Sequence, residues 1–200
     1  MKELTFTPQQ ISQIYKCSYS IEESRGKKRQ HLINSIIIES LKNNNNYDDC
    51  QFFTETRIKN ILWGKYFSID IEVHKNGKLI EIILAKAPAS NITQNSVNSL
   101  NGKAGEMSRL TPILKDGVKL TFITFQPIIS PFFTNGGIIK HFENNKVRTI
   151  NSLRENNVNV DFLDILITFN IEGIESCENR KDVQTIFSKK NIIGNIKLHV

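Results

Sequence analysis

A β-hairpin centred on Asn76-Gly77 is the feature that most limits how this chain can fold. A type I′ turn needs two residues that tolerate positive φ, and Asn-Gly is the dipeptide that favours it most strongly. Residues 67–88, FSIDIEVHKNGKLIEIILAKAP, alternate polar and apolar side chains before the turn, as half-buried strands do. We therefore predict two antiparallel strands joined by a two-residue loop, with Lys75 opposite Lys78.

With that register, the hairpin has one polar and one apolar face. The predicted pairs are Val73 with Ile80, Glu72 with Glu81 and Asp70 with Ile83. The polar face then holds Asp70, Glu72, His74, Glu81 and Ile83, and the other holds Ile69, Ile71, Val73, Ile80, Ile82 and Leu84. Opposed carboxylates repel each other, and a hard cation such as Mg²⁺, which takes oxygen ligands, removes that conflict. The alternative is a solvated face whose charge is balanced by Lys75 and Lys78.

Length and charge indicate one domain with an anionic partner. The 200 residues fit a single domain, 1–200, in which 1–25 form an N-terminal arm, 27–170 the core and 171–200 a C-terminal extension. The net charge is +6, which favours an anionic partner such as nucleic acid.

The cysteines and the N-terminal residues indicate an intracellular protein. Cys17, Cys50 and Cys177 are odd in number and far apart, so neither a disulfide framework nor a CxxC metal site is expected. The first ten residues lack the apolar stretch of a signal peptide, and no apolar run approaches the length of a membrane span. We expect a cytoplasmic protein that is not bound to a membrane.

The remaining patterns predict an α/β fold. A helix is expected from Thr7-Pro8 to Tyr15, and a second one over 26–42, ending before the Asn43–Asn46 run. Residues 51–66 fit a strand or a helix, and 90–114 fit a loop followed by a helix or two short helices broken at Gly102. Apolar strands are expected over 118–129 and 159–171, with one or two helices between them, which would make the two strands parallel. The order predicts a mixed β-sheet with helices on both faces.

The hairpin and the segment that follows it resemble the PD-(D/E)xK nuclease superfamily, especially type II restriction endonucleases. The residues that carry the resemblance are Asp70, the run Lys86-Ala87-Pro88, then Asn95, Asn98 and Ser99, and finally Gly105-Glu106-Met107-Ser108-Arg109-Leu110. The last three groups are similar to the patterns ExKxP, NxxNS and GExxRL. The resemblance spans residues 27–170.

The resemblance implies a restriction-endonuclease-like fold and a Mg²⁺-dependent endonuclease that cuts double-stranded DNA as a homodimer. In that family an Asp and a second acid bind the metal, and a Lys positions or activates the attacking water. Asp70, Glu81 and Lys86 are the residues that match these roles. Glu39, on the predicted second helix, is either a further metal ligand or a solvated glutamate.

The second half of the family motif is incomplete in either register. If Glu81 is the acid, Ile83 stands where the family has lysine; if Lys86 is the lysine, Leu84 stands where it has the acid. A three-residue turn with a bulge at Gly77 would bring Leu84 and Lys86 onto the face of Asp70. Three explanations remain open: a migrated site that uses Asp70, Glu81 and Lys86, an inactivated nuclease, and a protein of this fold that binds DNA without cutting it. A repair or junction nuclease is a further alternative.

Residues for DNA contact come from two segments. Lys27, Lys28 and Arg29 are candidate phosphate ligands, and Asn91, Gln94, Asn95 and Asn98 are candidates near the groove. Asn and Gln side chains can bind adenine through two hydrogen bonds. Glu106 fits either an ion pair with Arg109, three residues on along a helix, or a site residue, and the ion pair is preferred.

Overall fold

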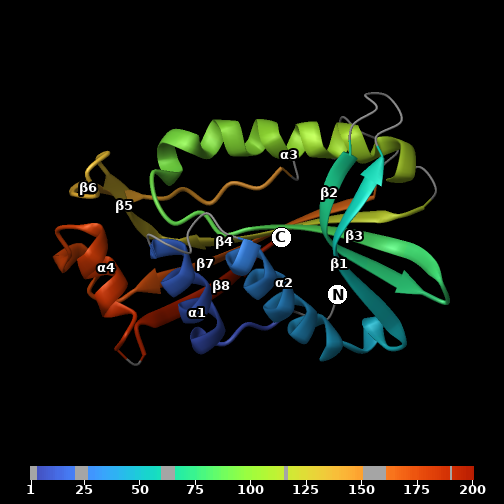
Figure 1. The fold of residues 1–200 in the computed structure, drawn as a ribbon, viewed down its shortest axis with the longest axis horizontal. Helices are drawn as coiled ribbons and strands as arrows, with labels where there is room; N and C mark the ends of the chain where they lie inside the picture. Colours follow the sequence, from blue (N-terminus) through green and yellow to red (C-terminus); the bar gives the residue numbers. More distant parts are fainter. Residues whose placement is uncertain (1–3, 21–26, 60–65, 115–116, 151–160, 190) are drawn as a thin grey trace.

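A computed structural model describes residues 4–20, 27–59, 66–114, 117–150, 161–189 and 191–200. A six-stranded mixed sheet forms its centre, in the order β1-β2-β3-β4-β7-β8 (Figure 1). The strands are β1 (Cys50–Lys59), β2 (Tyr66–Lys75), β3 (Lys78–Lys86), β4 (Lys119–Pro127), β7 (Phe162–Ile171) and β8 (Ile193–His199). Strands β3, β4 and β7 are parallel, while β1, β2 and β8 pair antiparallel to their neighbours. The predicted mixed sheet and the parallel pair of apolar strands are confirmed.

Helices cover both faces of the sheet, as expected for an α/β fold. Helices α1 (Pro8–Tyr19) and α2 (Lys27–Lys42) lie on one face and α3 (Ile92–Leu114) on the other (Figure 1). The smaller helical elements are α4 (Arg180–Ile186) and the 3₁₀ helices η1 (Asn45–Tyr47) and η3 (Ile174–Ser176). Each face has its own buried cluster, and the described part of the chain contains no helix long and apolar enough to cross a membrane.

The described N-terminal and C-terminal segments both belong to the central structure. Helix α1 begins with a capping box, in which the Thr7 hydroxyl accepts from the Gln10 backbone N–H and the Gln10 side chain accepts from that of Thr7. Ile11, Ile14 and Tyr15 of this helix are fully buried. The segment that we expected to be an arm therefore carries a core helix, and the expected C-terminal extension supplies β8 to the sheet.

Two ambiguous segments take one of the predicted forms. Residues Cys50–Lys59 form strand β1 at the edge of the sheet. Helix α3 runs without interruption through Gly102, because its apolar side chains repeat at helical spacing on both sides of that residue. Met107, Leu110 and Leu114 on this stripe are buried against the sheet.

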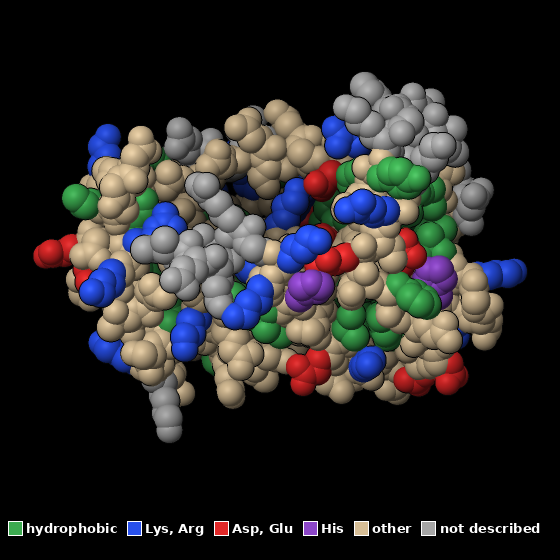
Figure 2. All heavy atoms as spheres, viewed as in Figure 1, with side chains coloured by type: hydrophobic (Ala, Val, Ile, Leu, Met, Phe, Trp, Pro, Cys, Tyr) green, Lys and Arg blue, Asp and Glu red, His purple; other side chains and the backbone are tan. Residues whose placement is uncertain are grey.

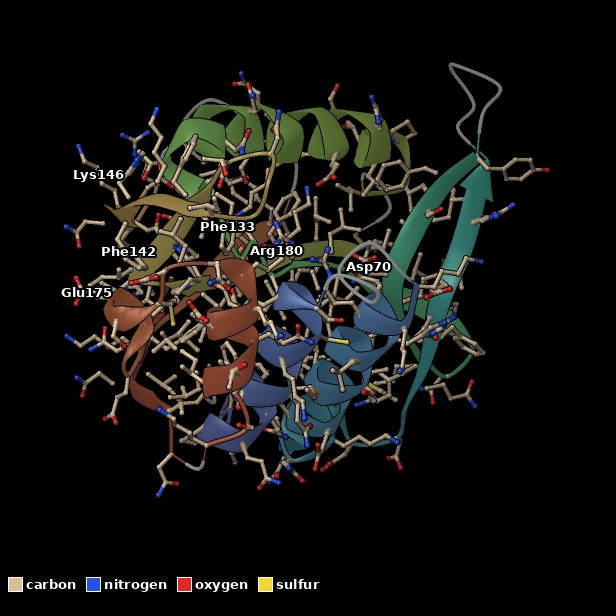
Figure 3. All side chains as sticks on the ribbon, turned by 60° about the vertical axis from the view of Figure 1, so that its left-hand side comes forward. Asp70, Phe133, Phe142, Lys146, Glu175 and Arg180 are labelled. Carbon is tan, nitrogen blue, oxygen red and sulfur yellow. The ribbon has the colours of Figure 1, made fainter. Side chains whose placement is uncertain are left out.

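The prediction of one or two helices between β4 and β7 is wrong for the part of that segment which the structure describes. Residues up to 150 form a small antiparallel sheet of β5 (Ile129–Phe133) and β6 (Ile139–Asn144) instead. Ile139 and Phe142 have helical spacing, but the adjacent β5 offers backbone partners that satisfy an extended chain. Arg180 of α4 covers the Phe133 ring at 4.6 Å from its centre (Figure 3).

The predicted two-residue turn joins β2 and β3. Asn76 has φ 52° and Gly77 has φ 73°, the positive values that a type I′ turn requires. Lys75 pairs with Lys78, as predicted. The three-residue turn is therefore not used.

A β-bulge in β3 then shifts the register by one residue, which the sequence analysis did not foresee. The pairing passes from His74 opposite Leu79 to Val73 opposite Glu81, so that Ile80 is the extra residue. The predicted pairs Val73–Ile80, Glu72–Glu81 and Asp70–Ile83 are wrong, and the observed ones are Val73–Glu81, Glu72–Ile82 and Ile71–Ile83. The bulge has the effect expected of a longer turn, although the turn itself has two residues.

The shifted register decides which side chains accompany Asp70. Directly opposed residues point to the same face of the sheet. Ile71 is opposite Ile83, so Asp70 shares a face with Leu84 and Lys86, and Glu81 points to the other face. The predicted polar face with opposed glutamates does not form. Glu72 instead accepts a hydrogen bond from the Thr56 hydroxyl at 2.5 Å and lies 3.0 Å from the His74 ring.

Candidate active site

Side chains from β2, β3 and α3 meet in one open pocket of about 570 Å³. Asp70, Lys86 and Glu106 line it, and Arg29 of α2 lies at its edge. The surface is hollowed between α3 and the first turns of α2, where Lys and Arg side chains stand beside acidic ones (Figure 2). This pocket is our candidate active site.

Asp70 is largely buried and is held by the neighbouring strand. Its Oδ2 accepts a hydrogen bond from the backbone N–H of Ala85 at 2.8 Å. Burial, and to a smaller extent the charges of Glu106 and Glu55, raises the pKa of Asp70 from 3.8 to about 6, against the lowering effects of the Ala85 bond and Lys86. A carboxylate that is costly to ionise gains most from a cation placed beside it.

We expect Asp70→Asn to stabilise the protein near neutral pH. Below pH 3.8 the Asp70 carboxyl is protonated in both the folded and the unfolded chain, so it carries no penalty there. As pH rises from 3.8 to about 6, the unfolded chain ionises first, and the folded state loses stability relative to it. Above that range Asp70→Asn should raise the free energy of unfolding by on the order of 2 kcal/mol.

Urea unfolding of both proteins at acidic and at neutral pH, without divalent metal, measures this difference. Asp48, an exposed carboxyl, provides the control, because Asp48→Asn should have the same small effect at both pH values. An Asp70→Asn effect that did not depend on pH would contradict the buried, costly carboxylate.

Lys86 and Glu106 form an ion pair that bridges β3 and α3. Lys86 Nζ lies 2.9 Å and 3.2 Å from the two Glu106 carboxylate oxygens, and both side chains are partly exposed to the pocket. The preferred sequence interpretation, an ion pair of Glu106 with Arg109, is wrong. Glu106 faces the sheet, where Lys86 reaches it, whereas Arg109 is exposed.

A third carboxylate, Glu55, stands opposite Asp70 on β1. Thr54 pairs with Ile71 and Thr56 with Ile69, which places Glu55 across from Asp70. Its backbone has φ 53°, a left-handed value that is unusual for a strand residue other than glycine and is typical of functional or strained positions. Glu55 Oε1 lies 3.2 Å from the His31 ring. Neither Glu55 nor His31 was singled out as a site residue from the sequence.

Two of the predicted metal ligands lie away from Asp70. Glu81 is buried on the other side of β3, where it accepts hydrogen bonds from the hydroxyls of Thr121 and Tyr47, the latter at 2.8 Å. Lys119 Nζ lies 3.7 Å from the same carboxylate. Glu39 accepts from Gln10 Nε2 at 2.9 Å, on the surface between α1 and α2. The bulge explains the displacement of Glu81, since it turns that residue away from the face of Asp70.

Helices α1 and α2 fix the strands around the pocket. Asn34, buried on α2, donates to the backbone oxygen of Asp70 at 3.0 Å, and its own side-chain oxygen accepts from Gln30. The Tyr15 hydroxyl lies 2.9 Å from the carbonyl oxygen of Pro88, and Tyr19 donates to that of Ala89 at 2.6 Å. The backbone that follows Lys86 is therefore fixed by hydrogen bonds from two buried tyrosines of α1.

The predicted DNA-contact residues divide into two groups. Arg29 lines the pocket, and Lys27 and Lys28 are exposed in the same turn of α2. Asn91 is used structurally, because its side chain accepts from the backbone N–H of Phe133 at 3.1 Å. Asn95 and Asn98 are exposed on the first turns of α3, while the side chain of Gln94 lies outside the described residues.

The chain shows no match to known proteins. Comparison with protein-family models, with curated proteins and with solved structures found no family, relative or structural neighbour. Within the described ranges, no group of three His, Cys, Asp or Glu side chains is arranged so that it could hold a metal ion.

Proposed function

We propose that the protein is a metal-dependent endonuclease of restriction-endonuclease-like fold that hydrolyses phosphodiester bonds in double-stranded DNA. The observation that carries this proposal is the convergence of Asp70, Lys86 and Glu106 in one open pocket. Leu84 occupies the position on β3 where the family has its second acid. In this protein Glu106 of α3 provides a second carboxylate in the pocket. This site differs from the migrated site expected from the sequence, which used Asp70, Glu81 and Lys86, because Glu81 lies on the other side of β3 and Glu106 takes its place.

The chemistry of the pocket fits Mg²⁺, which is usually held by one or two carboxylates together with water and substrate phosphate. Asp70 and Glu106 are the residues that would hold it. When bound, the metal makes a water molecule nucleophilic and stabilises the charge that develops on the phosphate. The raised pKa of Asp70 supports this assignment, because a divalent cation offsets the cost of a buried carboxylate.

The remaining residues act on the DNA phosphate. Lys86 places an ammonium group in the pocket, where it adds positive charge beside the phosphate and can orient the attacking water. Arg29, Lys27 and Lys28 begin α2 at the edge of the pocket and extend that positive surface. A homodimer is part of the proposal, since two copies related by a two-fold axis would cut both strands of a palindromic site.

Incubation with supercoiled plasmid DNA tests the proposed activity. We expect nicked, linear or fragmented products with Mg²⁺ and none with EDTA, and discrete fragments would identify a sequence-specific enzyme. Binding to a DNA duplex should weaken steeply with salt, because the contacts are made to phosphates. Neither cleavage nor salt-dependent binding, tested over a range of duplex sequences and with Mn²⁺ as well, would refute the nucleic-acid function.

The second candidate is a protein of the same fold that binds DNA without cleaving it. The ion pair between Lys86 and Glu106 favours it, because each of the two groups already has a partner of opposite charge. A gel shift that persists with Mg²⁺ while the plasmid stays intact would select this candidate. Discrete nicks at branched substrates alone would select a repair or junction nuclease.

A further inference from the structure

A second, smaller cavity lies next to the candidate active site. It has a volume of about 190 Å³ and lies between the first half of α3, strand β4 and the segment that follows β6. Pro88 and Ser99 line both this cavity and the candidate active site, so the two are neighbours. A single buried water needs roughly 10–15 Å³, so this space can accept a ring-sized organic group.

The cavity is lined by one buried hydroxyl that has no hydrogen-bond partner among the described residues. Thr124 on β4 is 6% exposed and lines the cavity, whereas its neighbours Ile123 and Phe125 belong to the core on the opposite face. Among the residues that the structure describes, Thr124 Oγ1 is the only buried side-chain nitrogen or oxygen with no hydrogen-bond partner. An unmade hydrogen bond at a buried group is costly, so this hydroxyl points to a polar group that enters the cavity.

The cavity lining includes an apolar part and a buried ion pair without net charge. Ile92, Leu100 and Leu166 provide the apolar surface. Lys103 also lines the cavity, but its ammonium group is neutralised by Asp164, whose Oδ1 lies 2.6 Å away. The interior therefore favours a neutral ring with polar atoms at its edge.

The mouth of the cavity is positively charged. Lys146 and Arg148 line it, both are exposed, and neither forms an ion pair with any carboxylate of the described ranges. Figure 3 shows Lys146 beside the first turns of α3. The backbone here is fixed, because Gln126 Nε2 donates to the carbonyl oxygen of Lys146 at 3.2 Å and Asn145 Nδ2 to that of Pro127 at 2.8 Å. Two cations that form no ion pair within the described ranges, carried on an ordered backbone, suit a phosphate group.

We propose that this cavity binds a nucleoside monophosphate unit, with the base inside against Thr124 and Gln126 and the phosphate at the mouth on Lys146 and Arg148. A base provides apolar faces for the walls and an edge of donors and acceptors for the Thr124 hydroxyl. The unit is either a free nucleotide or one nucleotide of a strand turned out of a duplex. Only the nucleotide turned out of a duplex rests on the proposed DNA-cleaving function.

Calorimetric titration of the protein with dAMP, dGMP, dCMP, TMP, the matching nucleosides and inorganic phosphate tests the proposal. We expect at least one nucleotide to bind more tightly than its nucleoside and than phosphate alone. The double variant Lys146→Gln/Arg148→Gln should weaken that nucleotide at least about 10-fold, since charged hydrogen bonds are lost. Lys140→Gln, which removes a charge from nearby β6 outside the cavity, is the matched control.

Thr124→Val tests the buried hydroxyl of the cavity without changing the size of the side chain. It should weaken the nucleotide roughly 3- to 10-fold, while the unliganded variant unfolds at a temperature no lower than the natural protein. Absence of nucleotide binding up to millimolar concentration, or binding that neither variant weakens, would overturn the proposal. Binding that neither variant weakens would show that the nucleotide associates with the protein outside this cavity.

The source of the nucleotide is distinguished with DNA duplexes that contain 2-aminopurine. A rise in its fluorescence on binding that is smaller in Thr124→Val identifies a base taken from the strand. An unchanged signal with intact mononucleotide binding identifies a free nucleotide. Plasmid cleavage is measured on the same preparations. Cleavage without mononucleotide binding or a fluorescence rise refutes only the cavity proposal, and mononucleotide binding without cleavage or duplex binding refutes only the nuclease.

Discussion

Lys86→Gln is expected to slow Mg²⁺-dependent DNA cleavage roughly 10²- to 10³-fold, the usual effect of removing one group that stabilises charge in a transition state. Lys86 is the lysine of β3 that lies in the pocket with Asp70, and its ammonium group is partly exposed there. Glutamine keeps a polar side chain, one atom shorter than lysine, but removes the charge. The loss should therefore fall on the rate more than on the affinity for DNA, which many other phosphate contacts maintain.

Single-turnover cleavage of a duplex substrate, with binding measured separately in Ca²⁺, provides the comparison. Lys78→Gln, at the other end of β3 and exposed beside the turn, removes the same charge away from the pocket and should leave the rate within about 3-fold. Circular dichroism checks that both variants fold. Equal rates for Lys86→Gln and the natural protein would remove Lys86 from the proposed chemistry.

Lys103→Met should destabilise the fold by about 3–5 kcal/mol, because it leaves the carboxylate of Asp164 buried without its partner. The two side chains are 4% and 0% exposed, and their charged atoms are 2.6 Å apart. Asp164 also accepts from the backbone N–H of Ile150 at 2.8 Å, so it cannot turn towards solvent without losing a second bond. Urea unfolding at neutral pH measures the loss.

Two comparisons show whether the effect comes from the uncompensated charge. Lys103→Met/Asp164→Asn should recover part of the stability, because the neutral amide still accepts from Ile150 and no charge stays buried. Lys86→Met breaks the more exposed ion pair with Glu106, which lies one turn beyond Lys103 on α3. It should lower the free energy of unfolding by no more than about 1 kcal/mol. Similar losses in Lys103→Met and Lys86→Met would contradict a special cost of burial at Asp164.

The local parts of the fold were predictable because their signals lie close together in the sequence. The Asn76-Gly77 turn, the helix that ends before the Asn43–Asn46 run and the two apolar strands around 119–127 and 162–171 all form as expected. In each case a turn residue or a regular apolar spacing specifies the element within about ten residues. The mixed sheet then follows from the order of these elements.

The site was only partly predictable, because its geometry depends on contacts between distant segments. Asp70 and Lys86 were identified as candidates, and the structure brings both into one pocket. The positions of Glu106 and Glu55 depend on the packing of α3 and β1 against the hairpin, which no short sequence pattern encodes. The bulge at Ile80 has no glycine or proline to indicate it. Glu81 was misplaced for that reason alone.

The bulge also restricts how this hairpin can vary during evolution. Because side chains alternate along a strand, the loss of one residue between the turn and Lys86 would turn Lys86 and Leu84 towards the face covered by α1 and α2 and bring Ala85 and Ile83 to the face of the pocket. Substitutions in this stretch leave the register intact, whereas a codon deletion or insertion exchanges the two faces. Descendants of this chain should therefore differ in residue identity along β3 but keep a constant number of residues from Asn76 to Lys86.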